Sequence, residues 1–288
     1  MKGYSAVIVI FHPNVIHLCQ MISLLKKQVE HIIIVDNTPL KSSFETSDIN
    51  IHLISLNDNL GIATAQNIGI RRSLELCCKR CFLFDQDSII PTNIGQQLAN
   101  DMDSLLNKGI PVACIGPRIL DVIEDKIENS KNEKKSPQGL TETRQIIASG
   151  SLLELNFLGK IGLMEDGLFI DAVDHEWCWR ARAKGYAIYI SENVIMEHMI
   201  GLGRGRVLLW NYIICSPVRH YYQFRNTFSL LYRGYVPLRW KIKKIIELIA
   251  MPIVYLLKGP QRKQRIHYML SGIKDGICGF SGKIKNGK

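Results

Sequence analysis

The chain has 288 residues, of which 47% are apolar, and its formal net charge at pH 7 is +10. Such a chain can bury a substantial core, either as one large domain or as a domain with an appendage. Its first residues do not form a secretion signal, because the apolar run from Ser5 to Phe11 is too short. Internal repeats and low-complexity segments are absent from the sequence. We therefore expect a cytosolic globular protein with reduced cysteines.

The eight cysteines are scattered, mostly within apolar stretches. Cys77, Cys78 and Cys81 resemble half of a zinc site, but no second pair of cysteines or histidines lies at a suitable spacing. The sequence therefore does not predict zinc here.

Charge is distributed unevenly along the chain. Residues 201–288 contain 17 lysines and arginines but only two acids, Glu247 and Asp275, whereas residues 1–200 carry a net charge of −5. An acidic body thus bears a basic C-terminal third, which suggests contact with nucleic acid or with an anionic membrane. A basic surface that is merely solvated is the alternative.

Strand-like and helix-like segments alternate through the first part of the chain. The expected strands are Tyr4–Phe11, His31–Val35, Ile51–Leu56, Cys81–Phe84 and Val112–Gly116. The expected helices are Val15–Val29, Ile62–Cys78 and Asn93–Leu106. This order predicts an α/β fold with a mostly parallel central sheet flanked by helices. The polar stretch Asp125–Leu140 is expected to be a surface excursion rather than a linker.

Asp85-Gln86-Asp87 is the clearest pointer to chemistry, because it directly follows the apolar strand Cys81–Phe84. Carboxylates so close together repel each other and usually need a cation between them. Open α/β sheets also bind ligands just outside the carboxyl ends of their strands. The pair therefore predicts a metal-assisted site for a phosphorylated substrate. The structural alternative is a tripeptide that only caps the next turn.

Other polar residues follow further expected strands. Asp36 ends the second strand, where a carboxylate can bind a ribose or a base. Asn59 and Gly61 precede a helix that contains Asn67, and they match a helix cap and a turn as well as a diphosphate contact. The spacing is not the dinucleotide fingerprint G-x-G-x-x-G. Gly150, between Ser149 and Ser151, resembles a small-residue strand that borders a pocket.

A second acidic cluster spans residues 171–177 and precedes a short helix expected at Trp177–Gly185. Asp174 and Glu176 either complement the dipole of that helix or include a general base for an acceptor hydroxyl. His198 follows the strand-like run Ala187–Ile195; a lone histidine is usually structural, but this one is a possible third metal ligand.

The apolar and basic segment Trp240–Leu257 is too short in its uncharged part to span a bilayer, and Pro252 interrupts it. An interfacial helix at an anionic membrane is expected. A helical hairpin that packs on the sheet or forms a dimer is the alternative.

Taken together, these motifs resemble the inverting family-2 glycosyltransferases of the GT-A fold, and specifically bacterial rhamnosyltransferases. The matching segments occur in the family's order over about residues 4–206. They are the strand ending in Phe11, Val35-Asp36-Asn37, Asn59-Leu60-Gly61, Ala65–Gly69, Phe84–Ser88, Ser149-Gly150-Ser151, Phe169–Arg182 and Gly185-Tyr186. The segment Arg219–Asn226 resembles a rhamnosyltransferase tail.

The resemblance implies a role for each group of residues. Asp174 would be the catalytic base and Glu176 an acceptor-site helper. Asp85, Asp87 and His198 would hold Mg²⁺ or Mn²⁺. The nucleotide sugar would be bound by Phe11, Asp36, Asn59, Gly61, Asn67, Asp85, Gln86 and Gly150. The acceptor or membrane side would include Trp177, Arg180, Arg219, Tyr222 and Arg225. Many relatives carry Glu-Asp at the base position, where this chain has Val173-Asp174.

The resemblance further implies transfer of L-rhamnose from dTDP-L-rhamnose to a lipid-linked oligosaccharide, in the synthesis of O-antigen or capsule at the inner face of the bacterial cell membrane. Another sugar, such as galactofuranose, glucose or N-acetylglucosamine, is the alternative donor. A catalytic domain is expected at residues 1–206 and a basic helical region at 207–288, which would bind membrane or form a homodimer. A basic nucleic-acid-binding protein and a scaffold without activity are the two rival classes. Nucleic acid is not an expected partner, because no helix-turn-helix, RRM or OB pattern occurs.

Overall fold

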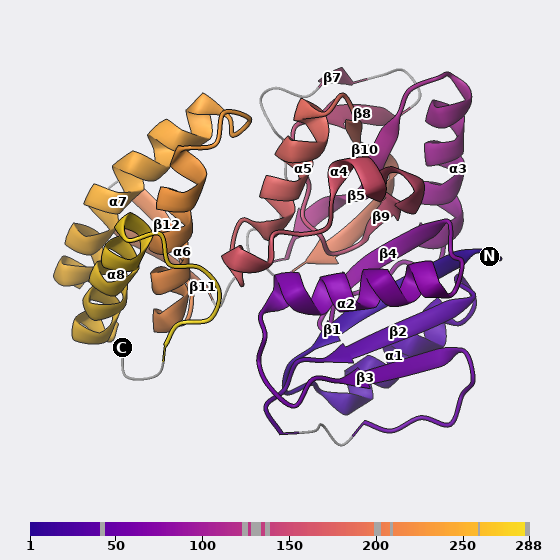
Figure 1. The fold of residues 1–288 in the computed structure, drawn as a ribbon, viewed down its shortest axis with the longest axis horizontal. Helices are drawn as coiled ribbons and strands as arrows, with labels where there is room; N and C mark the ends of the chain where they lie inside the picture. Colours follow the sequence, from indigo (N-terminus) through magenta and orange to yellow (C-terminus); the bar gives the residue numbers. More distant parts are fainter. Residues whose placement is uncertain are drawn as a thin grey trace.

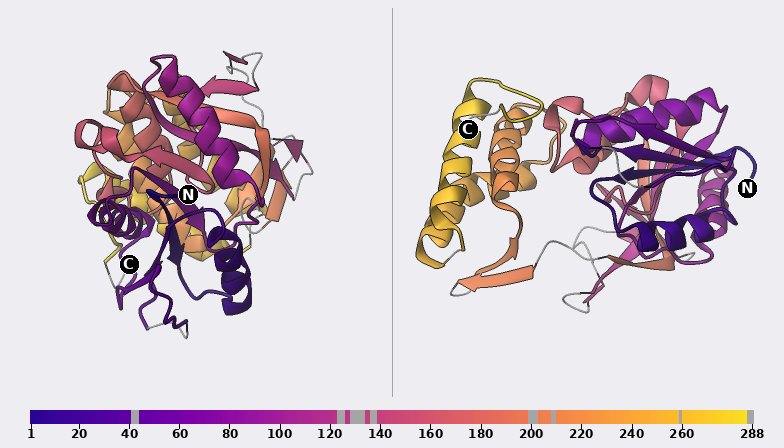
Figure 2. Two further views of the ribbon diagram at one scale, coloured as in Figure 1. Left: turned by 90° about the vertical axis from the view of Figure 1, so that its right-hand side faces the viewer. Right: turned by 90° about the horizontal axis from the view of Figure 1, so that it is seen from below.

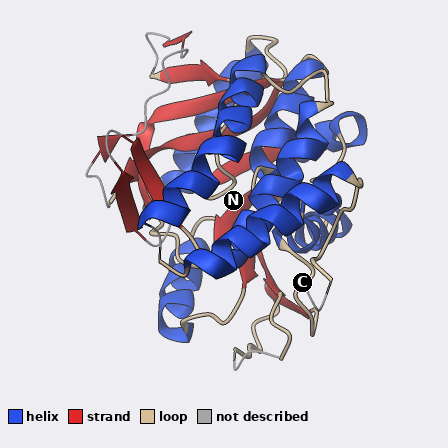
Figure 3. Cartoon of the chain, turned by 90° about the vertical axis from the view of Figure 1, so that its left-hand side faces the viewer, coloured by secondary structure: helices blue, strands red, loops and turns tan. Residues whose placement is uncertain are grey.

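The computed structural model describes residues 1–40, 44–122, 126–127, 134–135, 139–198, 203–207, 210–258 and 260–285. An α/β body contains the central sheet, and the last three helices form a separate group beside it (Figure 1). The right-hand view of Figure 2 shows the same division from below. We call this group, α6–α8, the helical unit; Figure 3 shows it in front of the sheet.

The central sheet is mixed, with most of its long strands running in one direction. Its order is β3-β2-β1-β4-β9-β5-β10-β8-β7, and β6 pairs with β5. The strands of common direction are β1 (Tyr4–Ile10), β2 (His31–Asp36), β3 (Ile51–Ser55), β4 (Arg80–Asp85), β5 (Val112–Asp121) and β10 (Ala187–His198). The other strands are β6 (Lys126–Ile127), β7 (Lys134–Lys135), β8 (Leu140–Thr143) and β9 (Ser151–Glu154).

β9 is the main departure from the expected parallel sheet. It lies between β4 and β5 and pairs antiparallel with both. The expected strand and helix bounds otherwise agree with the structure to within a few residues. Most of the expected excursion Asp125–Leu140 lies outside the described residues.

Helices cover both faces of the sheet, because its inner strands are apolar on both sides. In β1, Val7 and Val9 face one core while Ile8 and Ile10 face the other. The first core packs against α2 (Ile62–Glu75), α4 (Leu158–Ile161) and α5 (Val173–Ala183), and the second against α1 (Val15–Leu25) and α3 (Ile94–Asn107). Two short 3₁₀ turns, Leu155–Phe157 and Asp166–Leu168, flank α4.

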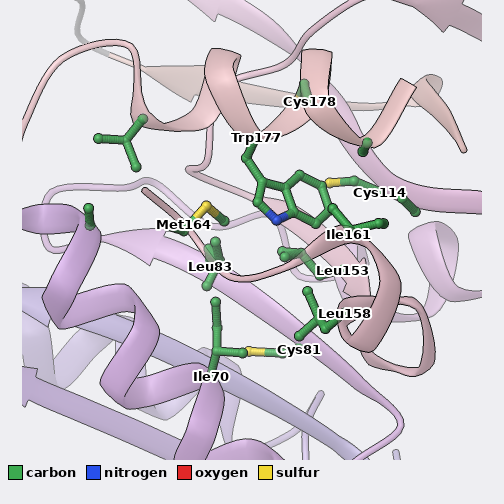
Figure 4. Packing of buried hydrophobic residues seen from close by; sticks show 14 of the residues in the cluster. Ile70, Cys81, Leu83, Cys114, Leu153, Leu158, Ile161, Met164, Trp177 and Cys178 are labelled. Atoms are coloured by element: carbon green, nitrogen blue, oxygen red, sulfur yellow. The ribbon is translucent and has the colours of Figure 1, made fainter. Parts of the chain in front are cut away.

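Trp177 anchors α5 to the sheet. Its indole lies among Leu83, Ile161 and Met164 (Figure 4), and its Nε1 donates a hydrogen bond to the carbonyl oxygen of Gly162 at 2.9 Å. Helix α5 begins at Val173 rather than at the expected Trp177. Asp174 therefore lies in the first turn of the helix.

The helical unit consists of α6 (Pro217–Leu231), α7 (Leu238–Lys258) and α8 (Arg262–Ile277). Phe224, Tyr255 and Met269 form part of its own small core. A hairpin of β11 (Gly203–Val207) and β12 (Trp210–Ile214) precedes it and spans the predicted domain boundary at 206/207. Among the described residues, no helix combines the length and the apolar content that crossing a membrane requires.

Candidate active site

The D-x-D motif lies at the carboxyl end of β4. Asp85 is the last residue of that strand and is half-buried, whereas Asp87 is exposed. Gln86 does not point away from the protein: its Oε1 accepts from the backbone nitrogen of Phe11 at 2.7 Å, and its Nε2 donates to the carbonyl oxygen of Phe11 at 3.0 Å. Gln86 thus ties the exits of β4 and β1 together, which differs from the expected contact with the nucleotide sugar.

The loop after the motif is joined to two other segments. The hydroxyl groups of Ser88 and Ser149 are 2.6 Å apart and both are buried. Ile89 forms an isolated antiparallel bridge with Glu197, which brings the backbone at the end of β10 beside the motif. His198 follows Glu197 directly and is the last residue of β10; its side chain lies outside the described residues.

The donor set at β4 suits a hard divalent cation. Two carboxylates, those of Asp85 and Asp87, lie on one short loop, and Mg²⁺ is commonly held by one or two carboxylates plus substrate phosphates. A cluster of three or more potential metal ligands of the His, Cys, Asp and Glu types is absent from the described residues. The two carboxylates therefore fit a cation that substrate phosphates also coordinate.

The next two strand ends form a polar rim beside the motif. Asp36 is only 1% exposed, and its Oδ1 accepts from the backbone nitrogen of Thr38 at 3.1 Å. Asn37 Nδ2 donates to Asn59 Oδ1 at 3.1 Å, and Asn37 Oδ1 accepts from the nitrogen of Leu60 at 2.8 Å. These bonds fix the turns that follow β2 and β3. Contacts of Asp36, Asn59 and the half-exposed Phe11 with a nucleotide stay predictions.

Three residues predicted to bind the nucleotide sugar make close contacts within the protein. A Cβ at Gly61, whose φ is +88°, would come within 2.6 Å of the Phe169 ring. Gly150 has φ +80°, and a Cβ there would lie 2.8 Å from Met196 Sδ. Asn67 is buried, and its Nδ2 donates to the carbonyl oxygen of Met164 and to Asp166 Oδ1. Tertiary contacts account for these three residue types, and their contact with a diphosphate stays a prediction.

Asp174 is connected to the loop after the D-x-D motif by hydrogen bonds. It is half-buried, and its Oδ2 accepts from the backbone nitrogen of Ala148 at 3.3 Å. Its Oδ1 accepts from the nitrogen of His175 at 2.8 Å, so the carboxylate also complements the first turn of α5. Ala148 precedes Ser149, which contacts Ser88 beside the D-x-D motif. Two hydrogen bonds and one peptide bond therefore connect Asp174 with that loop.

The segment before Asp174 is strained. Phe169, Asp171 and Ala172 all have positive φ values, of 62°, 69° and 65°. Phe169, with ψ −62°, is the centre of a γ-turn closed by a 2.7 Å hydrogen bond from the nitrogen of Ile170 to the carbonyl oxygen of Leu168. Such conformations cost about 1–3 kcal/mol each and persist only where surrounding contacts impose them.

Glu176 follows Asp174 by two positions, so the helix directs the two side chains to different faces. The side chain of Glu176 faces the core. It is 0% exposed, and its Oε1 accepts from Arg180 Nε at 2.8 Å, from Arg233 Nη1 at 3.2 Å and from the Tyr235 hydroxyl at 2.6 Å. Burial raises the pKa of Tyr235, and the hydrogen bond to Glu176 raises it further. This environment corrects the expectation that Glu176 assists at the acceptor site.

Most residues predicted on the acceptor or membrane side are also structural. Trp177 is in the core, and Arg180 donates to the carbonyl oxygens of Ile161 and Leu163 in addition to binding Glu176. Tyr222 is buried and stacks on Phe169, with ring centroids 4.7 Å apart. Because all of these groups are packed or paired within the protein, they do not present a surface to an acceptor.

Arg219 is the exception among them, with a side chain that is 40% exposed. It binds Asp171 through Nη2 at 2.6 Å and Nε at 3.2 Å. Burial opposes the charge of Arg219, but Asp171 outweighs it and raises the pKa of Arg219. Asp85 raises it further by a smaller amount, so this cation lies within electrostatic reach of the D-x-D motif.

Residues 225 and 226 hold the strained segment from the side of α6. Arg225 is buried, which lowers its pKa, and its Nη2 donates to the carbonyl oxygens of Gly167 and Leu168 at 2.9 and 3.0 Å. Asn226 was named in the sequence only as part of a tail motif, and its contacts with this segment were not expected. No local pattern signals them, because they join residues more than 50 positions apart.

The chain is similar to a known protein in sequence and to solved structures in fold. No family model matches the chain. The chain is 35% identical over 295 residues to the dTDP-rhamnosyl transferase RfbF of Shigella flexneri, covering 96% of each protein.

Among solved structures, TarS 1–349 of S. aureus in complex with UDP-GlcNAc has a TM-score of 0.59 at 14% identity, covering 97% of this chain and 82% of that one. GalNAc-T7 with UDP, GalNAc and Mn²⁺ has a TM-score of 0.55 at 12% identity, covering 95% of this chain and 55% of that one. These likenesses show the same fold. The chain therefore belongs to the rhamnosyltransferase family of GT-A glycosyltransferases.

Proposed function

We propose that this glycosyltransferase moves L-rhamnose from dTDP-L-rhamnose to a hydroxyl group of a lipid-linked oligosaccharide, with inversion at the anomeric carbon. The choice of donor rests on the similarity to a dTDP-rhamnosyl transferase. The observation that carries the chemistry is the connection from Asp174 through Ala148 and Ser149 to Ser88, beside the D-x-D motif. It supports a site in which Asp174 and the pair Asp85 and Asp87 act on one bound donor and acceptor.

Asp174 is proposed as the general base. Its carboxylate takes the proton of the acceptor hydroxyl while the hydroxyl oxygen attacks the anomeric carbon, and the bond from that carbon to the diphosphate breaks. Positioned proton transfer of this kind contributes about 10²–10⁴ in rate. One displacement inverts the anomeric carbon, so a β-linked donor gives an α-L-rhamnoside and dTDP. No protein acid is required, because the diphosphate is already a good leaving group.

Asp85 and Asp87 are proposed to hold Mg²⁺ or Mn²⁺ against the donor diphosphate. When bound, the cation stabilises the negative charge that develops on the leaving diphosphate. Arg219, which lies within electrostatic reach of Asp85, adds positive charge to the same rim. A third ligand from His198 remains part of this proposal.

The helical unit is proposed to contact an anionic membrane surface, which would bring the site to a lipid-linked acceptor at the inner face of the cell membrane. Large aliphatic residues are exposed along α7 at helical spacing. They are Leu238, Ile242, Ile245, Ile246, Ile249, Ile253, Leu256 and Leu257. Glu247, the one acid of α7, is paired with Lys243 and Lys244. Basic residues beside an apolar stripe are typical of interfacial helices.

The donor and metal are tested by thermal shift with nucleotide sugars in the presence and absence of Mn²⁺. We expect stabilisation by dTDP-L-rhamnose that depends on the metal and is lost in Asp87→Ala. Glu75→Gln, which removes an exposed carboxylate at the end of α2, is the matched control and should behave like the unsubstituted protein. Equal stabilisation of Asp87→Ala would contradict the ligand role. Stronger stabilisation by UDP-linked galactofuranose, glucose or N-acetylglucosamine would identify that nucleotide sugar as the donor instead.

The base is tested separately with Asp174→Asn. We expect this variant to bind dTDP-L-rhamnose normally and to lose transfer by about 10²-fold or more, as expected for removal of a general base. NMR of the product formed by the unsubstituted enzyme should show an α-L-rhamnoside. Retained turnover in Asp174→Asn would remove Asp174 as the base.

A further inference from the structure

The strained segment that leads into α5 is held by a buried side chain of α6. Asn226 is 2% exposed, and its Nδ2 lies 3.0, 2.8 and 3.0 Å from the carbonyl oxygens of Leu168, Ile170 and Asp171. Its two hydrogens serve these three acceptors, so one hydrogen is shared between two of them. One carboxamide nitrogen thus gathers three carbonyl groups of one short segment. A regular strand or helix does not direct three such nearby carbonyl oxygens at a single donor, so the segment is shaped around Asn226.

Arg225 completes the arrangement from the neighbouring position. Its Nε and Nη2 donate to Asn226 Oδ1 at 3.1 and 2.8 Å, which fixes the orientation of the carboxamide and turns Nδ2 toward the carbonyl groups. Arg225 also binds the carbonyl oxygens of Gly167 and Leu168, while Nη1 binds that of Gly282. The two residues therefore hold the backbone from 167 to 171.

This segment determines where the first turn of α5 begins. Ala172, with φ +65°, is the residue that precedes the helix, and Asp174 follows it by two positions. The positive φ values at 169, 171 and 172 are intrinsically unfavourable, so the segment has no preference of its own for this path. External hydrogen bonds must impose it.

We propose that Asn226, oriented by Arg225, is a positioning residue for the transfer reaction: it fixes the strained 168–172 segment and thereby the location of the Asp174 carboxylate. The proposal rests on the proposed function in that Asp174 is taken as the base. Asn226 itself is buried and does not touch the substrate. Its loss should therefore lower turnover while leaving donor binding at the D-x-D side intact.

The primary experiment measures kcat, KM for dTDP-L-rhamnose and the Kd of dTDP in Asn226→Ala. We expect kcat to fall by about 10²-fold, the effect of misplacing a catalytic group by ~1 Å. KM and Kd should change by less than about threefold, because Asn226 acts on the base and not on donor binding. Gln28→Ala is the matched control. Gln28 also buries a carboxamide that bonds backbone groups of Leu24, Pro91 and Gly95, but it precedes the amino end of β2, whereas the site lies at the carboxyl ends of the strands.

A double variant separates positioning from general loss of structure. If Asn226 acts through Asp174, Asp174→Asn combined with Asn226→Ala should be no slower than Asp174→Asn alone. A further loss in the double variant, or an unchanged kcat in Asn226→Ala, would overturn the proposal. An equal fall of kcat in Gln28→Ala would do the same, because it would show that any lost buried carboxamide has this effect.

Asn226→Asp covers the case in which the alanine variant does not fold. It keeps the shape of the side chain and the acceptor for Arg225, but it replaces the donor to the three carbonyl groups with an acceptor. The same fall in kcat at unchanged dTDP affinity is expected, and full activity would contradict the positioning role. Full turnover in Asp174→Asn, in contrast, would contradict the proposed base. It would also overturn the positioning role of Asn226, whatever the Asn226 variants show.

Discussion

Two neighbouring helices of the helical unit, α6 and α7, distribute polar and apolar residues in opposite ways. Helix α6 buries His220, Arg225 and Asn226, whereas α7 exposes aliphatic residues such as Ile249, which is 67% exposed. Buried polar groups are tolerated only when they are hydrogen-bonded, and α6 finds partners for them in the segment before α5 and in α8. Extended apolar surface, in turn, marks an interaction face.

The difference assigns the two helices to opposite tasks. Helix α6 faces the body and holds the strained segment that leads to the proposed base, Asp174. Helix α7 faces outward, toward the proposed membrane surface. Substitutions of the buried polar residues of α6 should therefore cost stability or turnover, and those of the exposed aliphatic residues of α7 should cost neither. Four predictions follow this contrast from the largest expected effect on stability to the smallest.

Arg225→Leu should destabilise the protein by about 3–5 kcal/mol, because the carbonyl groups of Gly167, Leu168 and Gly282 would each lose one donor and the carboxamide of Asn226 would lose the group that orients it. The guanidinium also lies over the rings of Tyr221 and Tyr222, at 5.5 and 5.1 Å from the centroids. Urea unfolding at pH 7.5 measures the change. A loss below about 1 kcal/mol, the level of an ordinary surface change, would contradict the role given to α6.

Glu176→Gln tests the junction of α5 with the end of α6. Arg233 and Arg180 would lose their buried carboxylate, and we expect about 3 kcal/mol of destabilisation, typical of a broken buried ion pair. At a temperature where the variant is folded, it should retain turnover within a few-fold, in contrast to Asp174→Asn. A loss of turnover as large as that of Asp174→Asn would show that Glu176 takes part in catalysis.

His220 makes the stability of the helical unit depend on pH. Burial and the nearby Arg265, whose Nη1 is 2.9 Å from His220 Nε2, lower the pKa of His220 from 6.5 to about 4. Between these values the unfolded chain binds the proton and the folded protein does not. The contribution of unprotonated His220 to the free energy of unfolding is therefore complete above pH 6.5. It falls as the pH is lowered toward 4, by about 3 kcal/mol in total.

Urea unfolding between pH 4.5 and 7.5 measures this dependence, with His220→Gln as the comparison. Glutamine can still accept a hydrogen bond from Arg265, but it does not titrate. The variant should lose the part of the pH dependence that belongs to this histidine. Identical slopes for the two proteins would show that His220 is not the responsible group.

Ile249→Ser combined with Ile253→Ser should leave the free energy of unfolding within about 0.5 kcal/mol, as expected for exposed positions. Binding to vesicles that contain anionic lipid should fall strongly in a flotation assay, while transfer to a soluble acceptor is unchanged. Unchanged vesicle binding would contradict the membrane proposal. A change of oligomeric state in sedimentation would instead identify α7 as a contact between two copies of the chain.

The predictability of the two regions differs for physical reasons. The body could be predicted because β1, β2 and β4 are apolar runs on both faces, a pattern set by residues adjacent in sequence. β9 could not, since four residues pair with two strands that lie about 70 and 40 positions earlier. Bounds of helices such as α2 and α3 were close because their apolar spacing is local.

The site was predicted less completely, for the same reason. Asp85, Asp87 and Asp174 lie at the strand and helix ends where the sequence placed them. Asp174 and Glu176 are only two positions apart, and nothing local distinguishes them. Their different environments arise from Arg233 and Tyr235, nearly 60 positions later. Gly61 and Asn67 were equally ambiguous, because a contact with Phe169 or Met164 leaves no signal in the surrounding sequence.

The bonds from Arg225 to the carbonyl oxygens of Gly167, Leu168 and Gly282 also have a consequence for biosynthesis. During translation, residues 1–200 emerge first and contain every strand of the central sheet. The groups that shape the approach to Asp174 emerge later, with α6 and with the turn at Gly282. A ribosome-bound chain that lacks them holds the acids but not their arrangement. On the proposed function, competence for sugar transfer is thus acquired only after α6 and the turn at Gly282 have emerged, when the sheet is already complete.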